Sequence, residues 1–401
     1  MKTLKIILLI FNIILAINSI HFGLFAIIPF FKRKKENYSK KNKKHKFMIL
    51  IAARNEEKVL GNLIDSLNNQ KYDKSLYKIC VIPNNCSDNT KKIALDKKCL
   101  VIEPNFNPKT KGEVLNYAFN YFQDDKSFDT YVIFDADNVV DRYFLKHMNS
   151  KLNSGYKVVQ GFRDTKNLYD NYLSGSYAIF FYLQSLFLYE SRSRLGEGST
   201  LNGTGYVVLK DYIEKIKYNS KTATEDIELT CYSAINHEKV GYEEKAIFYD
   251  EQVTQFGISM KQRKRWIQGS MQVFKNYYKN LYKEIKNNNS FQLIDMFHIL
   301  FLPVNQAIAF VILIVSYIFL VPLNIIIIGL VIGYIGEVLL SIFLILFFKK
   351  NLKKLLKACL FFPIFHISWI PIYLYSIFNS YSNWEEIKHD SSLKIEEILE
   401  D

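Results

Sequence analysis

Apolar and polar positions follow two different patterns along the 401-residue chain. Both ends carry long apolar blocks, whereas the region between them alternates short apolar runs with segments whose apolar residues recur at helical spacing. Short apolar runs predict buried strands, and the helical spacing predicts amphipathic helices between them. The pattern therefore predicts an α/β region flanked by segments of membrane type.

The N-terminal apolar block runs from Ile6 to Phe31 with few polar interruptions. It is longer than the ~20 residues that a helix needs to cross a bilayer. A cleaved signal peptide would have a shorter apolar core and a small-residue cleavage site, whereas here a basic run follows directly. We predict a retained transmembrane anchor over residues 1–31 and a basic linker over residues 32–46.

The C-terminal part, residues 291–379, offers three further apolar segments: Asp295 to Leu320, Ile325 to Phe348 and Ala358 to Phe378. If all of them cross the membrane, the polar tail of residues 380–401 lies on the outer side. Pro363 and Pro371 allow the alternative that the last segment is re-entrant, because proline interrupts helix hydrogen bonding. The side of the tail is therefore left open.

Charge is concentrated in two short stretches of the chain. Residues 32–46 hold nine basic residues and one glutamate, residues 349–357 hold five lysines, and together they equal the net charge of +13. Basic residues beside membrane spans favour the cytoplasmic side, although a merely solvated run is the alternative for residues 40–46. We therefore expect a multi-pass protein of the cell membrane whose central region is cytoplasmic. We expect no nucleic-acid partner, because the basic residues are not distributed over a folded face.

The first part of the central region, residues 47–161, predicts strands alternating with helices. The strand candidates are FMILIAA, YKICVI, CLVIE and TYVIFDAD, and the helices between them are NEEKVLGNLIDSLNNQ, SDNTKKIALDKK and GEVLNYAFNYF. This order predicts an α/β fold with a mostly parallel sheet and helices on both faces. We assign residues 47–258 to this domain and residues 259–290 to interfacial amphipathic helices. Ligands are expected beyond the carboxyl ends of the strands.

Two carboxylates, Asp135 and Asp137, end the last of these strands in the stretch YVIFDADN. Side chains at i and i+2 of an extended segment share a face, so both can reach one cation. Oxygen ligands suit Mg²⁺ or Mn²⁺, which take substrate phosphates as further ligands. One alternative is that these residues cap a turn, with Asp141 starting a helix. The nucleophile loop of haloacid-dehalogenase-like phosphatases also fits locally, but that family needs this loop near the domain start and a later acidic motif.

A second acidic stretch, TATEDIEL, offers a general base. Asp226, placed beside the ligand edge of the sheet, could remove a proton from an incoming hydroxyl. Thr222 and Glu225 also have the spacing of a capping box, so the alternative is that the acids stabilise a helix start.

The stretch QRKRWIQG contains Gln262, Arg265 and Trp266 in the order Q-x-x-R-W. A basic helix with a tryptophan at its boundary is also typical of a membrane-surface helix, and the two interpretations are compatible.

These motifs occur in an order that resembles the family 2 glycosyltransferases, in particular the membrane-embedded synthases related to bacterial poly-N-acetylglucosamine, hyaluronan and cellulose synthases. The resemblance covers residues 47–283 and rests on ILIAARNEE, VIPNNCSDNT, KGEVLNYAF, FDADN, NGTG, TEDIE and QRKRW. It implies a GT-A fold that transfers a sugar from a nucleotide diphosphate with inversion at the anomeric carbon.

The resemblance also implies residue roles on the donor side. Ala53, Arg54 and Glu56 are similar to nucleotide contacts, and Asn84 stands where the family usually has an acid, which puts base selectivity in doubt. Lys111 is similar to a diphosphate contact.

The remaining roles implied by the resemblance concern the metal, the base and the acceptor. Asp135 and Asp137 resemble the pair that positions the ribose and a Mg²⁺ or Mn²⁺ ion, with Asp137 the stronger metal ligand. Asp226 resembles the catalytic base, with Glu225 as its neighbour. Gln262, Arg265 and Trp266 are similar to the family's element that closes over the pyrophosphate and the acceptor.

The expected activity is transfer from a UDP-sugar to a polysaccharide or a membrane lipid at the cytoplasmic membrane face. A polymer synthase and a single-transfer glycolipid enzyme both fit the motifs, and export or accessory subunits would be partners of the former. A different class, a non-catalytic membrane protein that binds a nucleotide sugar or a dinucleotide messenger, is encouraged only by Asn84.

Overall fold

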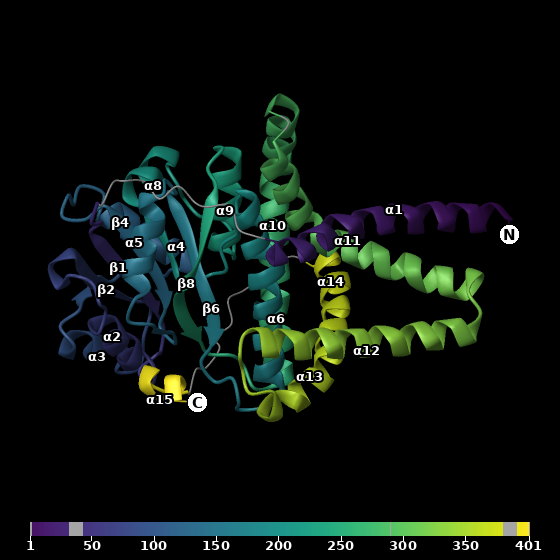
Figure 1. The fold of residues 1–401 in the computed structure, drawn as a ribbon. Coiled ribbons are helices and arrows are strands. Elements are labelled where there is room, and N and C mark those ends of the chain that lie inside the picture. The colour runs from purple at the N-terminus through teal and green to yellow at the C-terminus, as the bar shows by residue number, and fades with distance from the viewer. Residues whose placement is uncertain (1, 32–42, 289, 380–390, 401) are drawn as a thin grey trace.

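The computed structural model describes residues 2–31, 43–288, 290–379 and 391–400. Its sheet is built from β1 (Phe47–Ala53), β2 (Tyr77–Pro83), β3 (Leu100–Val101), β4 (Thr130–Asp135), β5 (Val139–Val140), β6 (Val158–Thr165), β7 (Tyr206–Leu209) and β8 (Val240–Asp250). The strands are ordered β3-β2-β1-β4-β7-β6-β8-β5 in one eight-stranded sheet (Figure 1).

The first half of the sheet is parallel, as the sequence predicts. β1 pairs with β2 and β4, and β2 pairs with β3, all in parallel register. The second half is mixed, because β7 runs antiparallel to both β4 and β6 and β5 runs antiparallel to β8, whereas β6 and β8 are parallel. The α/β class is confirmed, but the mostly parallel arrangement holds only where strands and helices alternate in the chain.

Helices cover both faces of the sheet because alternate strand residues point to opposite sides. On one face, Ile49 and Ile51 pack with residues of α2 (Leu60–Asn68), α3 (Thr90–Asp96) and α5 (Phe144–Asn153). On the other face, Met48 and Leu50 pack with residues of α4 (Lys111–Tyr121), α8 (Lys210–Ile216) and α9 (Glu225–Ile235). Full burial of each such aliphatic side chain stabilises the fold by roughly 1.5–3 kcal/mol. The short 3₁₀ turn η2 (Lys74–Leu76) leads into β2.

A second layer of helices separates the sheet from the membrane-type segments (Figure 1). It contains α6 (Tyr172–Gln184), which continues through the π-helical segment η3 (Ser185–Glu190) into α7 (Ser191–Leu195), and the long helix α10 (Phe256–Asn288). α10 contacts α9 on the sheet side and α11 (Phe291–Leu320) and α14 (Trp369–Phe378) on the other. α10 therefore connects the sheet domain to the apolar helices.

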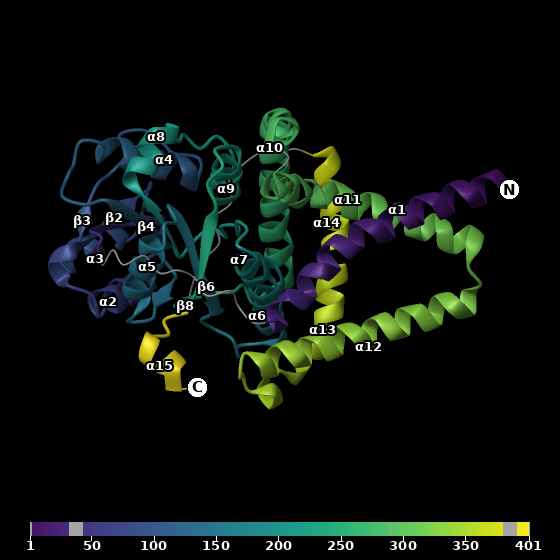
Figure 2. The same ribbon diagram turned by 45° about the horizontal axis from the view of Figure 1, so that its top comes forward.

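Three apolar segments are long enough to cross a membrane: α11, α12 (Leu323–Phe347), and the pair α13 (Leu352–Ile367) and α14 taken together. They confirm the three apolar C-terminal segments expected from the sequence. The N-terminal block forms α1 (Lys2–Ile27), which ends in the turn η1 (Ile28–Phe30) and packs alongside α11 (Figures 1 and 2). The membrane crossing of α1 stays a prediction, and most of the basic linker, residues 32–42, lies outside the described residues.

The described part of the C-terminal tail contacts the sheet domain. The backbone N–H of Ser391 donates to Glu251 Oε1 at 3.0 Å, and the Ser391 carbonyl accepts from Lys166 Nζ at 2.5 Å. Asn62 Nδ2 donates to the Ser392 carbonyl at 2.7 Å, and α15 (Ile395–Glu400) follows. α14 runs across the direction of α11 and α12 (Figures 1 and 2). The described part of the tail therefore lies beside the sheet domain, and the side of a membrane on which the two lie stays a prediction.

Candidate active site

The carboxyl ends of β1, β2 and β4 open into one cavity of about 440 Å³. Register places Ala52 opposite Asp135 and Ala53 opposite Pro83, so the residues that follow these strands lie at the same edge. The cavity is lined by every site residue predicted from the sequence: Ala53, Arg54, Glu56, Asn84, Lys111, Asp135, Asp137, Glu225, Asp226, Gln262, Arg265 and Trp266. The structure brings these residues together, while their individual roles stay predictions.

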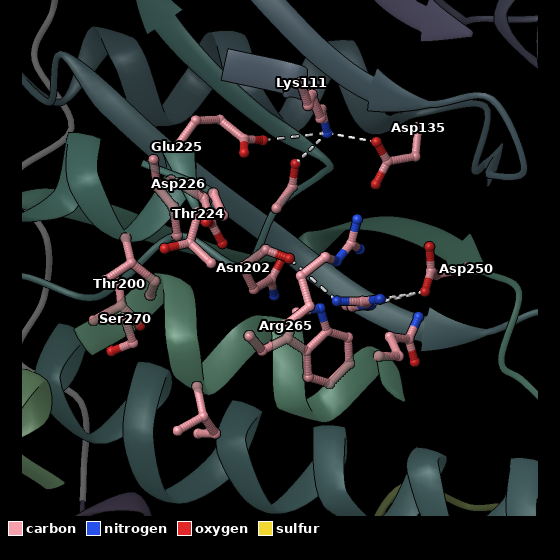
Figure 3. Close-up of a pocket in the computed structure, with 18 of the residues that line it drawn as sticks. Lys111, Asp135, Thr200, Asn202, Thr224, Glu225, Asp226, Asp250, Arg265 and Ser270 are labelled. Atoms are coloured by element: carbon pink, nitrogen blue, oxygen red, sulfur yellow. Dashed lines mark hydrogen bonds and ion pairs between the residues drawn. The ribbon is translucent and has the colours of Figure 1, made fainter. Parts of the chain in front are cut away.

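Lys111, the first residue of α4, connects the two acidic stretches (Figure 3). Its Nζ lies 2.5 Å from Asp135 Oδ1, 3.6 Å from Glu225 Oε1, and 2.6 Å from the carbonyl of Gly203. Burial lowers the pKa of Lys111, but the nearby charges of Asp135 and Glu225 outweigh burial and hold it above its ordinary value. Lys111 therefore keeps its positive charge on the wall of the cavity.

The glycine after Lys111 allows the two acidic stretches to approach each other. A Cβ on Gly112 would lie 2.3 Å from Ser220 Oγ and 3.2 Å from Glu225 Cβ. A side chain here would push the loop before α9 away from the start of α4. The sequence Lys-Gly thus brings an ammonium group close to Glu225.

Asp135 and Asp137 form a cluster with a third carboxylate, Asp250, which the sequence analysis missed. One oxygen from each of the three lies within 4.8 Å of the others. Asn138 Nδ2 donates to Asp137 at 3.2 Å and to Asp250 at 2.7 Å, and so holds the group together. Three hard oxygen donors fit Mg²⁺ or Mn²⁺. Neither Asp135 nor Asp137 caps a helix, because the element that follows β4 is the strand β5 and not a helix.

Asp250 ends β8, which reaches this edge from the far half of the sheet. Its carboxylate also accepts from Arg163 and from Gln252 Nε2. The stretch IFYDE repeats the pattern of VIFDAD, an apolar run that ends in carboxylates. That repeated pattern is the signal that could have identified Asp250.

Glu225 and Asp226 begin α9 and face the cluster of Asp135, Asp137 and Asp250 across the cavity (Figure 3). Burial raises the pKa of Glu225 to about 7; Lys111 opposes this rise, whereas the charges of Asp226 and Asp135 add to it. Burial also raises the pKa of Asp226 above its ordinary value. A carboxylate with a raised pKa is a stronger base than one in water, which suits proton abstraction near neutral pH.

Thr222 and Glu225 do not form a capping box, although Glu225 and Asp226 lie in the first turn of α9. The N-cap of α9 is Thr224, whose side chain makes no capping hydrogen bond. The Thr222 hydroxyl donates instead to Glu228 at 2.9 Å. Gly203, in the NGTG stretch, has φ +93°, and a Cβ there would lie 3.8 Å from Asp226 Oδ2, so this turn shapes the wall beside Asp226.

Glu228, also missed from the sequence, holds the loop that carries the two acids. Its Oε2 accepts from the backbone N–H groups of Lys221 and Thr222 at 2.9 and 3.0 Å and from the Ser220 hydroxyl at 3.0 Å. Its Oε1 accepts from the hydroxyl of Tyr277, on α10, at 2.7 Å. A buried carboxylate with this many donors is a strong anchor, and it ties the loop to α10.

We expect Tyr277→Phe to lower the rate of catalysis by about tenfold, because loss of one hydrogen bond to a buried charge loosens the loop that carries Asp226. The matched control is Tyr278→Phe, whose side chain is 40% exposed on the same helix. Steady-state kinetics and the melting temperature of both variants would be compared. Equal kcat for the two variants would show that this contact does not position the loop.

The Q-x-x-R-W residues project from α10 into the cavity near Asp226. The buried Oε1 of Gln262 and the Thr224 hydroxyl have no hydrogen-bond partner among the described residues. Trp266 stacks near Trp369 with ring centroids 6.3 Å apart. Arg265 adds a guanidinium group to the same wall (Figure 3). These groups offer polar contacts and an aromatic surface to a ligand on the side of the cavity that faces the apolar helices.

The sheet topology, the acidic cluster and the cavity beside it define a GT-A type of nucleotide-sugar transferase fold. The family "Glycosyltransferase like family 2" matches residues 45–269, and the chain belongs to this family.

Curated relatives and a solved structure are similar to this chain. A probable glycosyltransferase, YdaM of Bacillus subtilis, is 25% identical over 273 residues, which cover 64% of this chain and 63% of that protein. A beta-monoglucosyldiacylglycerol synthase of Trichormus variabilis is 27% identical over 243 residues, or 57% of this chain and 50% of that protein. The chain thus spans between half and two thirds of the length of these relatives.

Among solved structures, the mannosyltransferase PcManGT from Pyrobaculum calidifontis, in complex with GDP-Man and Mn²⁺, shares the fold with a TM-score of 0.60. The identity is 13%, and the match covers 91% of this chain and 99% of that one. This likeness supports the fold over almost the whole chain, including the apolar helices.

Proposed function

We propose that this protein is an inverting glycosyltransferase that moves a sugar from a UDP-sugar to a hydroxyl group of a polysaccharide or a membrane lipid. The observation that carries the proposal is that Asp226 and the acidic cluster of Asp135, Asp137 and Asp250 line opposite sides of one cavity. A base and a leaving-group site on opposite sides of a sugar ring favour in-line displacement. Inversion at the anomeric carbon follows from that arrangement.

The donor would occupy the end of the cavity at the sheet. Ala53, Arg54 and Glu56 would contact the nucleotide, and Asn84 would present an amide to the base. Lys111 and Arg265 would stabilise the negative charge that develops on the departing diphosphate, because fixed charges in a buried site act strongly on a developing charge. Asp135, Asp137 and Asp250 would hold a Mg²⁺ or Mn²⁺ ion, which supplies Lewis-acid stabilisation of phosphate oxygens when bound.

Asp226 would take the proton of the acceptor hydroxyl as its oxygen attacks. The acceptor would meet Gln262, Arg265 and Trp266, whose helix α10 lies between the sheet and the apolar segments. We further propose that the protein resides in the cell membrane, with residues 47–258 as the catalytic domain and residues 259–290 at the cytoplasmic membrane surface.

The direct test is release of UDP by the purified full chain, with a panel of UDP-, GDP- and TDP-sugars, Mg²⁺ or Mn²⁺, and a membrane lipid extract. Thermal shift across the same panel identifies the nucleotide, because a bound ligand stabilises the folded state. Release of UDP from a UDP-sugar is the expected result. Binding of a nucleotide without turnover would support a non-catalytic binding protein instead.

We expect kcat/KM to fall as the pH is lowered, because Asp226 must be unprotonated and its pKa lies above the ordinary 3.8. Glu225→Gln should shift this acidic limb to lower pH, since it removes a neighbouring negative charge and leaves Lys111 to attract Asp226. The pH–rate profiles of both proteins would be compared. A limb that does not move, or that moves to higher pH, would contradict this coupling.

A further inference from the structure

The cavity continues past Asp226 into an apolar half. Its walls there come from the second layer of helices and from the apolar helices. They are formed by Phe180 on α6, Leu188 in η3, Ile267 on α10, Ile299 and Leu302 on α11, and Trp369 on α14. Because α11 is long and apolar enough to cross a membrane, one wall of this half belongs to a candidate span. The donor site and the apolar helices therefore share one continuous cavity.

The apolar half contains polar groups suited to an amphipathic ligand. Trp369 is only 5% exposed, and its Nε1–H has no hydrogen-bond partner among the described residues. A buried donor of this kind costs stability unless a ligand oxygen accepts from it. An ester or ether oxygen beside an acyl chain would satisfy it. Ser270, on α10, is a second polar side chain that lines the cavity (Figure 3).

The candidate spans are poorly arranged for moving a polymer. Only 22% of the most apolar window of α11 and 17% of that of α12 are buried, so both helices expose most of their surface to the surroundings. α12 contributes no described residue to the cavity wall, and neither does α1. A growing polysaccharide needs an enclosed polar path across the bilayer, because sugar hydroxyls are costly to expose to hydrocarbon. Among the described residues, the apolar helices contribute mainly apolar and aromatic side chains to the cavity wall: Ile299, Leu302, Pro303, Trp369 and Tyr373.

Building on the proposed function, we propose that the acceptor is a membrane lipid with a free headgroup hydroxyl, and that each turnover adds one sugar. The acyl part lies against Ile299, Leu302 and Trp369, and the headgroup reaches Asp226. The hydroxyl oxygen forms the bond to the anomeric carbon as the bond from that carbon to the phosphate oxygen breaks. The proton goes to Asp226, and UDP leaves with the electron pair.

The product decides between a lipid and a polymer. The full chain is reconstituted in vesicles of hydroxyl-free phosphatidylcholine, with and without a total lipid extract of bacterial membranes, and given a labelled UDP-sugar that supports UDP release. The expected result is label in the organic phase as one defined adduct, only when the extract is present. A water-soluble ladder, or UDP release with no labelled lipid, overturns the inference. Failure to release UDP from every donor would instead overturn the proposed function.

A variant pair on α11 tests the route itself. Leu302→Trp fills the apolar half and should lower lipid labelling by about tenfold, because overpacking excludes the acyl chain. Thermal shift by UDP should not change, since the donor end is untouched. Leu313→Trp is the matched control, because Leu313 is 40% exposed and lies outside the cavity wall. Equal labelling by the two variants, or loss of the UDP shift in Leu302→Trp alone, would overturn the assignment.

Discussion

Asp226→Asn should reduce sugar transfer by about a thousandfold while UDP still binds, because the amide keeps the shape of the carboxylate but cannot accept the proton of the acceptor hydroxyl. The expected size follows from general-base catalysis, which typically contributes about 10²–10⁴-fold to a rate. In the proposed mechanism, Asp226 lies on the acceptor side of the cavity that it lines, and the donor binds across from it. Transfer would be measured as product formation, and UDP binding as a thermal shift or by calorimetry.

The matched control for this experiment is Asp211→Asn, an exposed carboxylate on α8 that lies outside the cavity wall. It should transfer sugar at the rate of the unmodified protein. A parallel loss of UDP binding in Asp226→Asn would return Asp226 to a structural role at the start of α9. Full activity of Asp226→Asn would remove the base from the proposed mechanism.

Asp137→Asn should lower transfer by about a hundredfold or more at fixed metal concentration, because the acidic cluster loses one of its charged oxygens. The loss should be partly restored when the concentration of Mn²⁺ is raised, since a weaker site is filled by mass action. Asn138 bridges Asp137 and Asp250 and keeps the remaining carboxylates in place. Activity would be titrated against Mg²⁺ and Mn²⁺ in both proteins.

Asp141→Asn provides the comparison for this titration. Asp141 comes directly after β5, close to Asp137 in the chain. Its carboxylate, however, accepts from the backbone N–H of Tyr143 at 2.8 Å and lies outside the cavity wall. Its metal dependence should match that of the unmodified protein. Identical metal curves for all three proteins would show that the cluster does not bind the functional ion.

The first half of the fold could be predicted because its information is local. FMILIAA and YKICVI are strands whose apolar runs are bounded by turn residues, and they form β1 and β2 in the structure. β7 and β8 were not recognised, because their pairing joins segments that are distant in the chain. The antiparallel insertion of β7 between β4 and β6 is set by packing and not by local propensity.

The residues of the candidate site were found for a similar reason. Asp135 and Asp137 share a face by strand periodicity, and Asp226 lies in a short acidic motif, so each could be selected from its neighbours in the chain. Glu228 and Asp250 were missed because their importance depends on partners far away in sequence, such as Tyr277 for Glu228 and Asn138 for Asp250. A single carboxylate at the end of a strand carries little signal until its partners are known.

The sequence by itself determined that this chain has apolar helices at both ends, an α/β region between them, and the motifs of a sugar-transferring family, because hydrophobic period and motif spacing are written along the chain. Only the tertiary structure decided that Asp226 faces the acidic cluster across one cavity, that this cavity extends to α11 and α14, and that the tail returns to the sheet domain. Those relations depend on how helices far apart in the chain pack together, and packing is a property of the folded molecule.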